Sequence, residues 1–220
     1  MRKSVVGILG TAKNTGKTTT TNTLLDNAIQ NRLSIGLTSI GYDGEDLDNI
    51  TELPKPRIRG VKGMLIATAE RCLTAGTAQI RPIVRTPLKT PLGDIVIGRV
   101  VEEGLVVLAG PNKGRDLNTL LQGINELECN LTFVDGALNR LVPLMETEAL
   151  VLATGASRDT STEFLAHEVR SIYQIFGLPV WDCAEPKPWA EVRDAITLVG
   201  KKGVISVPGA GSLIRDHEVE

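Results

Sequence analysis

Apolar residues along the chain fall into short blocks, and the spacing within each block predicts its secondary structure. Residues 5–9 are almost entirely apolar, which indicates a strand buried on both faces, as in parallel sheets. Residues 18–31 carry apolar side chains at helical spacing and predict a helix that buries one face. Residues 34–40 form a second apolar block and therefore a second predicted strand.

The later part of the chain continues this alternation. The apolar spacing predicts strands at 131–136, 149–154, 178–181 and 203–207, and helices at 117–127, 161–176 and 191–199. Strands that alternate with helices are typical of a parallel sheet covered by helices on both faces. We therefore predict an α/β fold with three layers and a mainly parallel sheet.

The middle of the chain has a different pattern. Apolar stretches at 61–67, 79–84, 94–101 and 105–109 show almost no helical spacing, so this section is β-rich. Glu102, Glu103 and Gly104 have the chemistry of a hairpin turn. We predict a β-rich antiparallel insertion around residues 78–110, grafted onto the parallel sheet.

Composition and charge narrow the classes of protein and partner. With 220 residues and 42% apolar content, the chain can build one substantial core, and we expect a single domain over 1–220. The net charge is −2 and the basic residues form no stripe, so we expect no nucleic-acid partner. No apolar run reaches membrane length, and no signal-peptide layout precedes the first strand. These features predict a cytoplasmic protein without a membrane partner.

Cysteine and histidine do not indicate a metal site. Cys72, Cys129 and Cys183 are widely separated and odd in number, which is typical of reduced thiols rather than a disulfide framework or a metal cage. His167 and His217 lack a neighbour at ligand spacing. Candidate chemistry therefore has to come from other residues.

The strongest candidate is the turn that follows the first strand. Asn14 and Gly16 tolerate the backbone angles that turn successive N–H groups inward, and the following helix adds its positive N-terminus. Such a concave site suits a polyphosphate. Lys17 would place a compact positive charge on the outer phosphates, and the Thr18 hydroxyl suits a Mg²⁺ ion that bridges them. The alternative is a glycine turn before an ordinary helix.

The spacing of this turn carries a family resemblance. Five residues separate Gly10 from Gly16, whereas the common phosphate-binding pattern has four and would need a glycine at Thr11. The form G-T-x-x-x-x-G-K-T resembles the dethiobiotin synthetase branch of P-loop proteins, within a wider group of cobyrinic acid amidases, partitioning ATPases and nucleotide-dependent metallochaperones. Lys13 is one place away from the extra lysine of the partitioning ATPases, so we do not assign it their cross-subunit role.

The resemblance implies a P-loop fold that binds ATP with Mg²⁺. The residues that it places on the nucleotide are Gly10, Thr11, Lys13, Asn14, Thr15, Gly16, Lys17, Thr18 and Thr19. Two-fold dimers are frequent in this group, so the resemblance also leaves a homodimer open.

The resemblance also implies acidic residues at the metal. Residues 131–136 look like a Walker B strand, whose Asp135 would bind Mg²⁺ directly or through water. An acidic loop follows the second strand, and there Asp43 is the first candidate and Glu45 the second, although a solvated turn is an equal alternative. The implied catalytic residues are Lys17, Asp43 and Asp135, and the implied metal ligands are Thr18, Asp43, Glu45 and Asp135.

The base and the second substrate are less defined. Residues 112–115 approximate the guanine-reading N-K-x-D pattern, but Arg115 occupies the place of the aspartate, which favours ATP over GTP. Segments 182–188 and 208–212 are candidates for the base. Four basic residues of the middle section could line a substrate surface or form a solvated β face: Arg81, Arg85, Lys89 and Arg99.

We expect a P-loop NTPase that hydrolyses ATP with Mg²⁺ and is coupled to a partner enzyme or a small substrate. One alternative is a ligase of dethiobiotin synthetase type, which phosphorylates a carboxylate. Another is a non-catalytic nucleotide switch, because the loop and the segments at 133–140 and 153–157 are also similar to an accessory ATPase that reactivates adenosylcobalamin-dependent aminomutases.

Overall fold

A computed structural model describes residues 3–41, 58–137, 146–177, 195–200 and 203–208 of the chain. The chain divides into two compact units, residues 1–167 and residues 168–220. The prediction of a single domain over 1–220 stays a prediction.

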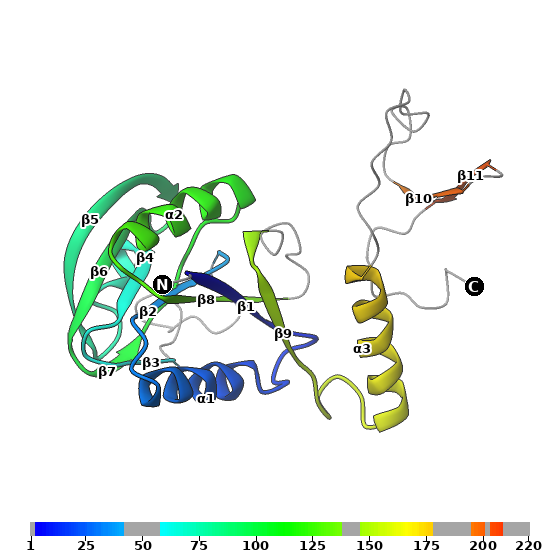
Figure 1. Ribbon diagram of the computed structural model, residues 1–220, viewed down its shortest axis with the longest axis horizontal. Helices are drawn as coiled ribbons and strands as arrows, with labels where there is room; N and C mark the ends of the chain where they lie inside the picture. The colour runs from blue at the N-terminus through cyan, green and yellow to red at the C-terminus, as the bar shows by residue number, and fades with distance from the viewer. Residues whose placement is uncertain (1–2, 42–57, 138–145, 178–194, 201–202, 209–220) are drawn as a thin grey trace. The chain divides into compact units, whose positions relative to one another are not determined.

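The first unit is built on a seven-stranded sheet with the order β5-β6-β4-β2-β8-β1-β9 (Figure 1). Five neighbouring strands are parallel: β4 (Leu65–Ala69), β2 (Ile35–Ser39), β8 (Leu131–Ala137), β1 (Ser4–Gly10) and β9 (Ala149–Ala153). The remaining two, β6 (Gly93–Glu102) and β5 (Gln79–Thr90), extend the β4 edge in antiparallel orientation. The predicted α/β class, mainly parallel sheet and antiparallel part are thus confirmed, whereas the P-loop assignment stays a prediction.

The hairpin that makes the antiparallel edge lies elsewhere than predicted. Strands β5 and β6 pair up to Thr90 and Gly93, whereas Gly104 begins β7 (Gly104–Val106), which pairs with β3 (Ile58–Gly60). A Cβ atom on Gly104 would lie 2.4 Å from the backbone nitrogen of Ala78. The glycine is therefore required by a close approach of two chain segments rather than by a turn, and the prediction at 102–104 was wrong.

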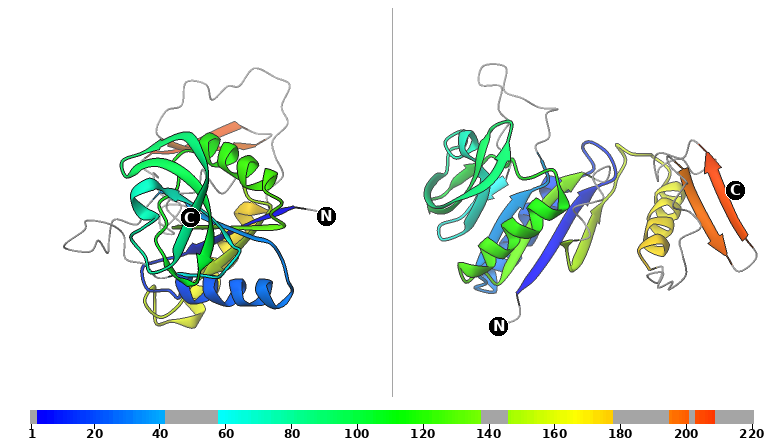
Figure 2. Two further views of the ribbon diagram at one scale, coloured as in Figure 1. Left: turned by 90° about the vertical axis from the view of Figure 1, so that its left-hand side faces the viewer. Right: turned by 90° about the horizontal axis from the view of Figure 1, so that it is seen from above.

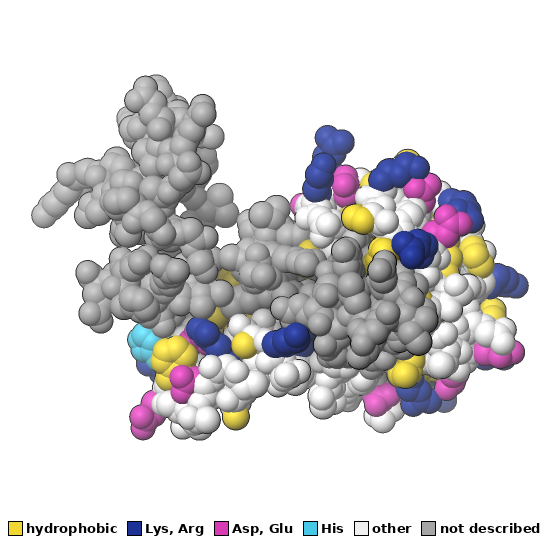
Figure 3. Space-filling view, turned by 180° about the vertical axis from the view of Figure 1, so that it is seen from behind, with side chains coloured by type: hydrophobic (Ala, Val, Ile, Leu, Met, Phe, Trp, Pro, Cys, Tyr) yellow, Lys and Arg dark blue, Asp and Glu magenta, His cyan; other side chains and the backbone are white. Residues whose placement is uncertain are grey.

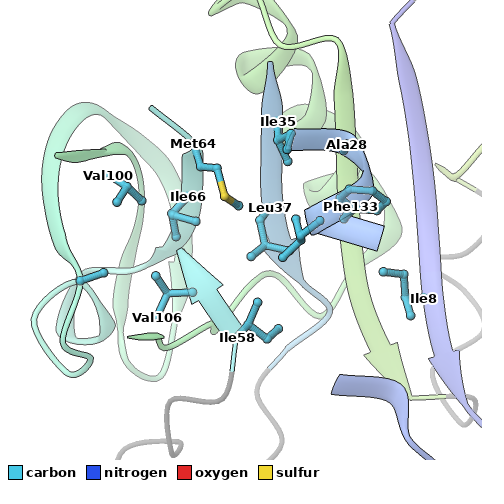
Figure 4. Close-up of a cluster of buried hydrophobic side chains, with 12 residues drawn as sticks. Ile8, Ala28, Ile35, Leu37, Ile58, Met64, Ile66, Val100, Val106 and Phe133 are labelled. Carbon is cyan, nitrogen blue, oxygen red and sulfur yellow. The ribbon is translucent and has the colours of Figure 1, made fainter. Parts of the chain in front are cut away.

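Helices cover both faces of the sheet and give the predicted three layers (Figure 2). On one face, α1 (Lys17–Gln30) packs Leu25 and Ala28 against a core that includes Leu37 and Phe133 (Figure 4). On the other face, α2 (Gly114–Glu126) buries Leu120 and Ile124 against Leu65, Ala67 and Ile97. Burial of this apolar surface fixes the positions of both helix N-termini. A short 3-10 helix, η2 (Glu70–Cys72), follows β4.

Strands β2 and β4 separate towards their carboxyl ends, and the segment after β7 fills the space between them. The Thr68 hydroxyl donates to the carbonyl of Val107 at 3.0 Å and accepts the amide of Ala109 at 2.8 Å. On the other side, the amide of Gly110 donates to the carbonyl of Gly41 at 3.0 Å. These hydrogen bonds pair the buried polar groups between β2 and β4, and they fix the backbone where the chain leaves the carboxyl end of β2.

The chain continues with α3 (Thr162–Phe176), close to the predicted helix 161–176, and then β10 (Ala195–Gly200) and β11 (Gly203–Pro208), which form an antiparallel pair. The prediction of a helix at 191–199 was wrong from Ala195 onward. Ile196, Thr197 and Val199 are β-branched and suit a strand once a partner is available. Among the described residues, no helix has the length and apolar character needed to span a membrane.

Candidate functional site

The parallel strands at the centre of the sheet end at one common edge. In the register, Gly10 at the end of β1 is paired with Ala137 of β8 and with Ala153 of β9, and Ser39 of β2 is paired with Asp135. The loops that leave these strands therefore start side by side. Ligands of open α/β sheets bind at this carboxyl edge.

The loop between β1 and α1, residues 11–16, is called the phosphate loop below, after the ligand that the sequence predicts for it. Asn14 has φ 62° and Gly16 has φ 88°, so two of its residues adopt left-handed conformations. Backbone with such residues can turn N–H groups towards one point and form an anion nest. A Cβ on Gly10 would lie 2.8 Å from the Thr15 hydroxyl, so this glycine allows the loop to close on itself.

Two threonine hydroxyls hold the phosphate loop, one through a bond within the loop and one through a bond to the end of β9. Thr15 donates to the carbonyl of Ala12 at 2.9 Å, within the loop. Thr11 donates through its hydroxyl to the hydroxyl of Thr154 at 2.9 Å, and through its amide to the carbonyl of Ala153 at 3.0 Å. Both loop threonines are buried, whereas Lys13 and Asn14 between them are exposed. The start of the loop is thus fixed to the end of β9, and its tip is accessible.

Helix α1 begins directly after this loop, with features that favour an anion. Its N-cap is Gly16, which has no side chain to cap the first N–H groups, and the first turn contains no acidic residue. The helix N-terminus therefore keeps its partial positive charge. No atom lies within 4 Å of a Cβ placed on Gly16, so there is open space beside the helix start.

Lys17 and Asp135 come together at the centre of the site. The Lys17 ammonium lies 3.2 Å from a carboxylate oxygen of Asp135, and the two side chains are 17% and 16% exposed. The backbone of Asp135 is held by pairing with β1 and β2, and its carbonyl accepts the amide of Ile40 at 2.8 Å. The pair is therefore set by the sheet.

Thr18 lies in the first turn of α1 and is half-buried. Further along the helix, Thr21 and Thr23 donate their hydroxyls to helix carbonyls one turn earlier, at 3.0 and 2.9 Å. A hydroxyl and a carboxylate are hard oxygen donors, the type that Mg²⁺ accepts together with phosphate oxygens and water, so Thr18 and Asp135 fit the implied metal.

Other predicted site residues do not all join this cluster. Asp43 and Glu45 lie outside the described residues, as do the candidate base segments 182–188 and 208–212. Thr19 is exposed on α1, one residue beyond Thr18. Among the described residues, no group of three or more His, Cys, Asp or Glu side chains could hold a metal ion.

The basic residues of the middle section lie on the antiparallel edge and are partly paired. Arg85 lies 2.5 Å from Glu70 and lowers the pKa of that carboxyl, and Lys89 lies 2.7 Å from Asp94. On the face shown in Figure 3, Lys and Arg side chains lie among Asp and Glu side chains. These contacts favour the solvated β face over a substrate surface.

The sequence interpretation missed the loop after β9. Thr154 contacts Thr11, and a Cβ on Gly155 would lie 3.8 Å from the carbonyl oxygen of Thr15. The sequence feature that could have indicated this loop is a polar, glycine-containing segment directly after a predicted buried strand. The carboxyl end of that strand lies at the same sheet edge as the phosphate loop.

No protein-family model, curated protein or solved structure matches this chain. The family resemblance therefore depends on the motifs themselves.

Proposed function

We propose that this protein binds ATP together with Mg²⁺ at the phosphate loop and hydrolyses it, in a reaction coupled to a small substrate or a partner protein. The observation that carries this proposal is the start of α1. An uncapped helix N-terminus with open space beside Gly16 is followed by Lys17, which lies 3.2 Å from the only acidic residue of β8, Asp135.

Backbone amides and side chains of this protein bind different parts of the triphosphate. The amides of the phosphate loop and of the first turn of α1 donate to phosphate oxygens, because both segments present N–H groups and contain no acidic residue. Lys17 neutralises charge on the outer phosphates and stabilises the charge that develops during phosphoryl transfer. A bound Mg²⁺ would supply further charge neutralisation, held by the oxygens of Thr18 and Asp135.

A purely structural ion pair is the competing explanation for Lys17 and Asp135. A structural pair would not require a left-handed glycine at the helix start, nor a lysine at the first position of the helix. Here both features occur beside a loop whose start is anchored and whose tip is exposed. Together they support a ligand-binding role.

Calorimetric titration of the wild-type protein with ATP, in the presence of Mg²⁺, tests the proposal. We expect saturable binding, competition by tripolyphosphate, and protection of residues 10–18 from hydrogen exchange. No heat, no thermal shift and no protection of these residues would contradict the proposal.

Measurement of phosphate release from ATP then distinguishes a hydrolase from the ligase and the switch alternatives. Turnover by the protein alone indicates a hydrolase, and turnover stimulated by small carboxylic acids indicates the ligase alternative. ATP that binds and stays intact until a partner protein is added indicates the switch alternative.

A further inference from the structure

We propose that Thr154 is a positioning residue that holds the phosphate loop in its anion-binding shape before a ligand arrives. This inference rests on the proposed function, because it assigns a role to a residue outside the nucleotide motif. Thr154 directly follows β9 and is half-buried, and its hydroxyl accepts the hydroxyl of Thr11 at 2.9 Å.

The identity of residue 11 supports this role. Among the described residues, the non-glycine positions with positive φ are Asn14, Arg32 and Glu128, so the backbone at Thr11 does not demand a glycine. Where the common phosphate-binding pattern has a glycine, this chain has Thr11, whose side chain is 8% exposed and donates a hydrogen bond to Thr154. Thr11 therefore attaches the loop to a strand that the phosphate motif itself does not include.

The two hydroxyl anchors have different consequences. The bond from Thr15 to Ala12 shapes the loop internally, whereas the bond from Thr11 to Thr154 fixes the loop relative to β9. An anion nest needs several N–H groups held towards one point, and order that exists before binding reduces the entropy lost on binding. The hydroxyl of Thr154 thus increases affinity without touching the ligand.

The test compares Thr154→Val, which removes the hydroxyl but keeps the shape, with Thr154→Ser, which keeps the hydroxyl. Calorimetry measures the Kd of each protein for ATP and for tripolyphosphate, both with Mg²⁺. We expect Thr154→Val to weaken both ligands by a similar factor of about three- to tenfold, the effect of one hydrogen bond, and Thr154→Ser to restore binding.

Two further variants keep the test decisive. Thr11→Val removes the same bond from the other side, so the double variant should be no weaker than either single variant. Thr86→Val removes a threonine hydroxyl of β5 that donates to the carbonyl of Ile95 on β6 at 2.8 Å, and it should leave both Kd values unchanged.

The outcomes distinguish this inference from the proposed function. If wild-type protein binds neither ligand, the proposed function fails and this inference fails with it. If wild-type protein binds and Thr154→Val binds equally well per folded molecule, only the role of Thr154 is overturned. A melting temperature that falls while both Kd values stay unchanged would also overturn it, because it indicates a purely structural bond.

Discussion

The ammonium nitrogen of Lys17 lies 3.2 Å from a carboxylate oxygen of Asp135, which joins the start of α1 to the end of β8. A phosphate that approaches Lys17 therefore also approaches a negative charge. A divalent cation removes this conflict, because it neutralises Asp135 and attracts the phosphate at the same time. We therefore expect nucleotide affinity at the proposed site to depend on the metal.

Asp135→Asn should reduce this dependence. We expect ATP in excess chelator to bind about tenfold more tightly to the variant than to the wild type, because a nearby negative charge is removed. Binding of ATP with Mg²⁺ should weaken, because a metal ligand is lost. Calorimetry at fixed ionic strength measures both affinities. Asp26→Asn, on the exposed side of α1, is the control. Equal metal dependence in the variant and the wild type would exclude a role of Asp135 at the metal.

Lys17→Ala should weaken ATP binding without unfolding the chain. The Lys17 side chain is 17% exposed and lies against Asp135 rather than in the apolar cluster under α1, so its removal takes no side chain from that cluster. A charged hydrogen bond to phosphate, by contrast, is worth about 1.5–3 kcal/mol, or roughly 10- to 100-fold in Kd. Lys62→Ala, an exposed lysine in the turn before β4, is the matched control. Unchanged ATP affinity in Lys17→Ala, with normal affinity in the control, would count against the proposed site.

Gly110→Ala should destabilise the fold strongly. A Cβ at this position would lie 1.7 Å from the carbonyl oxygen of Ser39, so the segment after β7 that fills the space between β2 and β4 has to move. We expect a loss of at least about 3 kcal/mol in the free energy of unfolding, measured by urea denaturation. Gly123→Ala in α2 provides the comparison, since its Cβ would meet only the Ile97 side chain at 3.3 Å. Similar losses of stability in both variants would contradict the close packing of Gly110 against Ser39.

Stability should fall at alkaline pH through Cys72. Burial raises the pKa of its thiol from 9.0 to about 11. Between these values the unfolded chain has lost the proton and the folded chain has kept it, so stability present below pH 9 is lost as the pH rises towards 11. The loss is about 1–3 kcal/mol.

Urea midpoints measured from pH 8 to pH 11 test this expectation. Cys72→Ala should be less stable at every pH, because a buried side chain is truncated, but it should show a smaller decline above pH 9. Burial also raises the pKa of the Cys129 thiol, and this residue is present in both proteins. An identical decline in the two proteins would show that Cys72 does not contribute.

Local patterns were sufficient to predict the elements that form the centre of the site. The first strand, the helix after it and the strand that ends near Asp135 are apolar or amphipathic blocks, and their boundaries agree with the structure to within a few residues. Gly16 was expected to need unusual backbone angles, and it has φ 88°. Such features depend on neighbouring residues in the chain, which a sequence shows directly.

Gly104 and residues 195–199 were misinterpreted because the contacts that determine their structure come from segments distant in sequence. Gly104 has turn chemistry, yet its small size is required by the backbone of Thr77 and Ala78. Residues 195–199 have helical spacing, yet they pair with β11. In both places a contact with another segment overrides the local preference, and spacing alone contains no information about that segment.

The sequence by itself determined that a glycine-rich turn joins a buried strand to a helix that starts with Lys17, because that chemistry lies within one short segment. Only the tertiary structure decided that Asp135 meets Lys17 and that Thr154 anchors Thr11. Those contacts arise from the strand order β8-β1-β9, which aligns the carboxyl ends of three strands at one edge of the sheet.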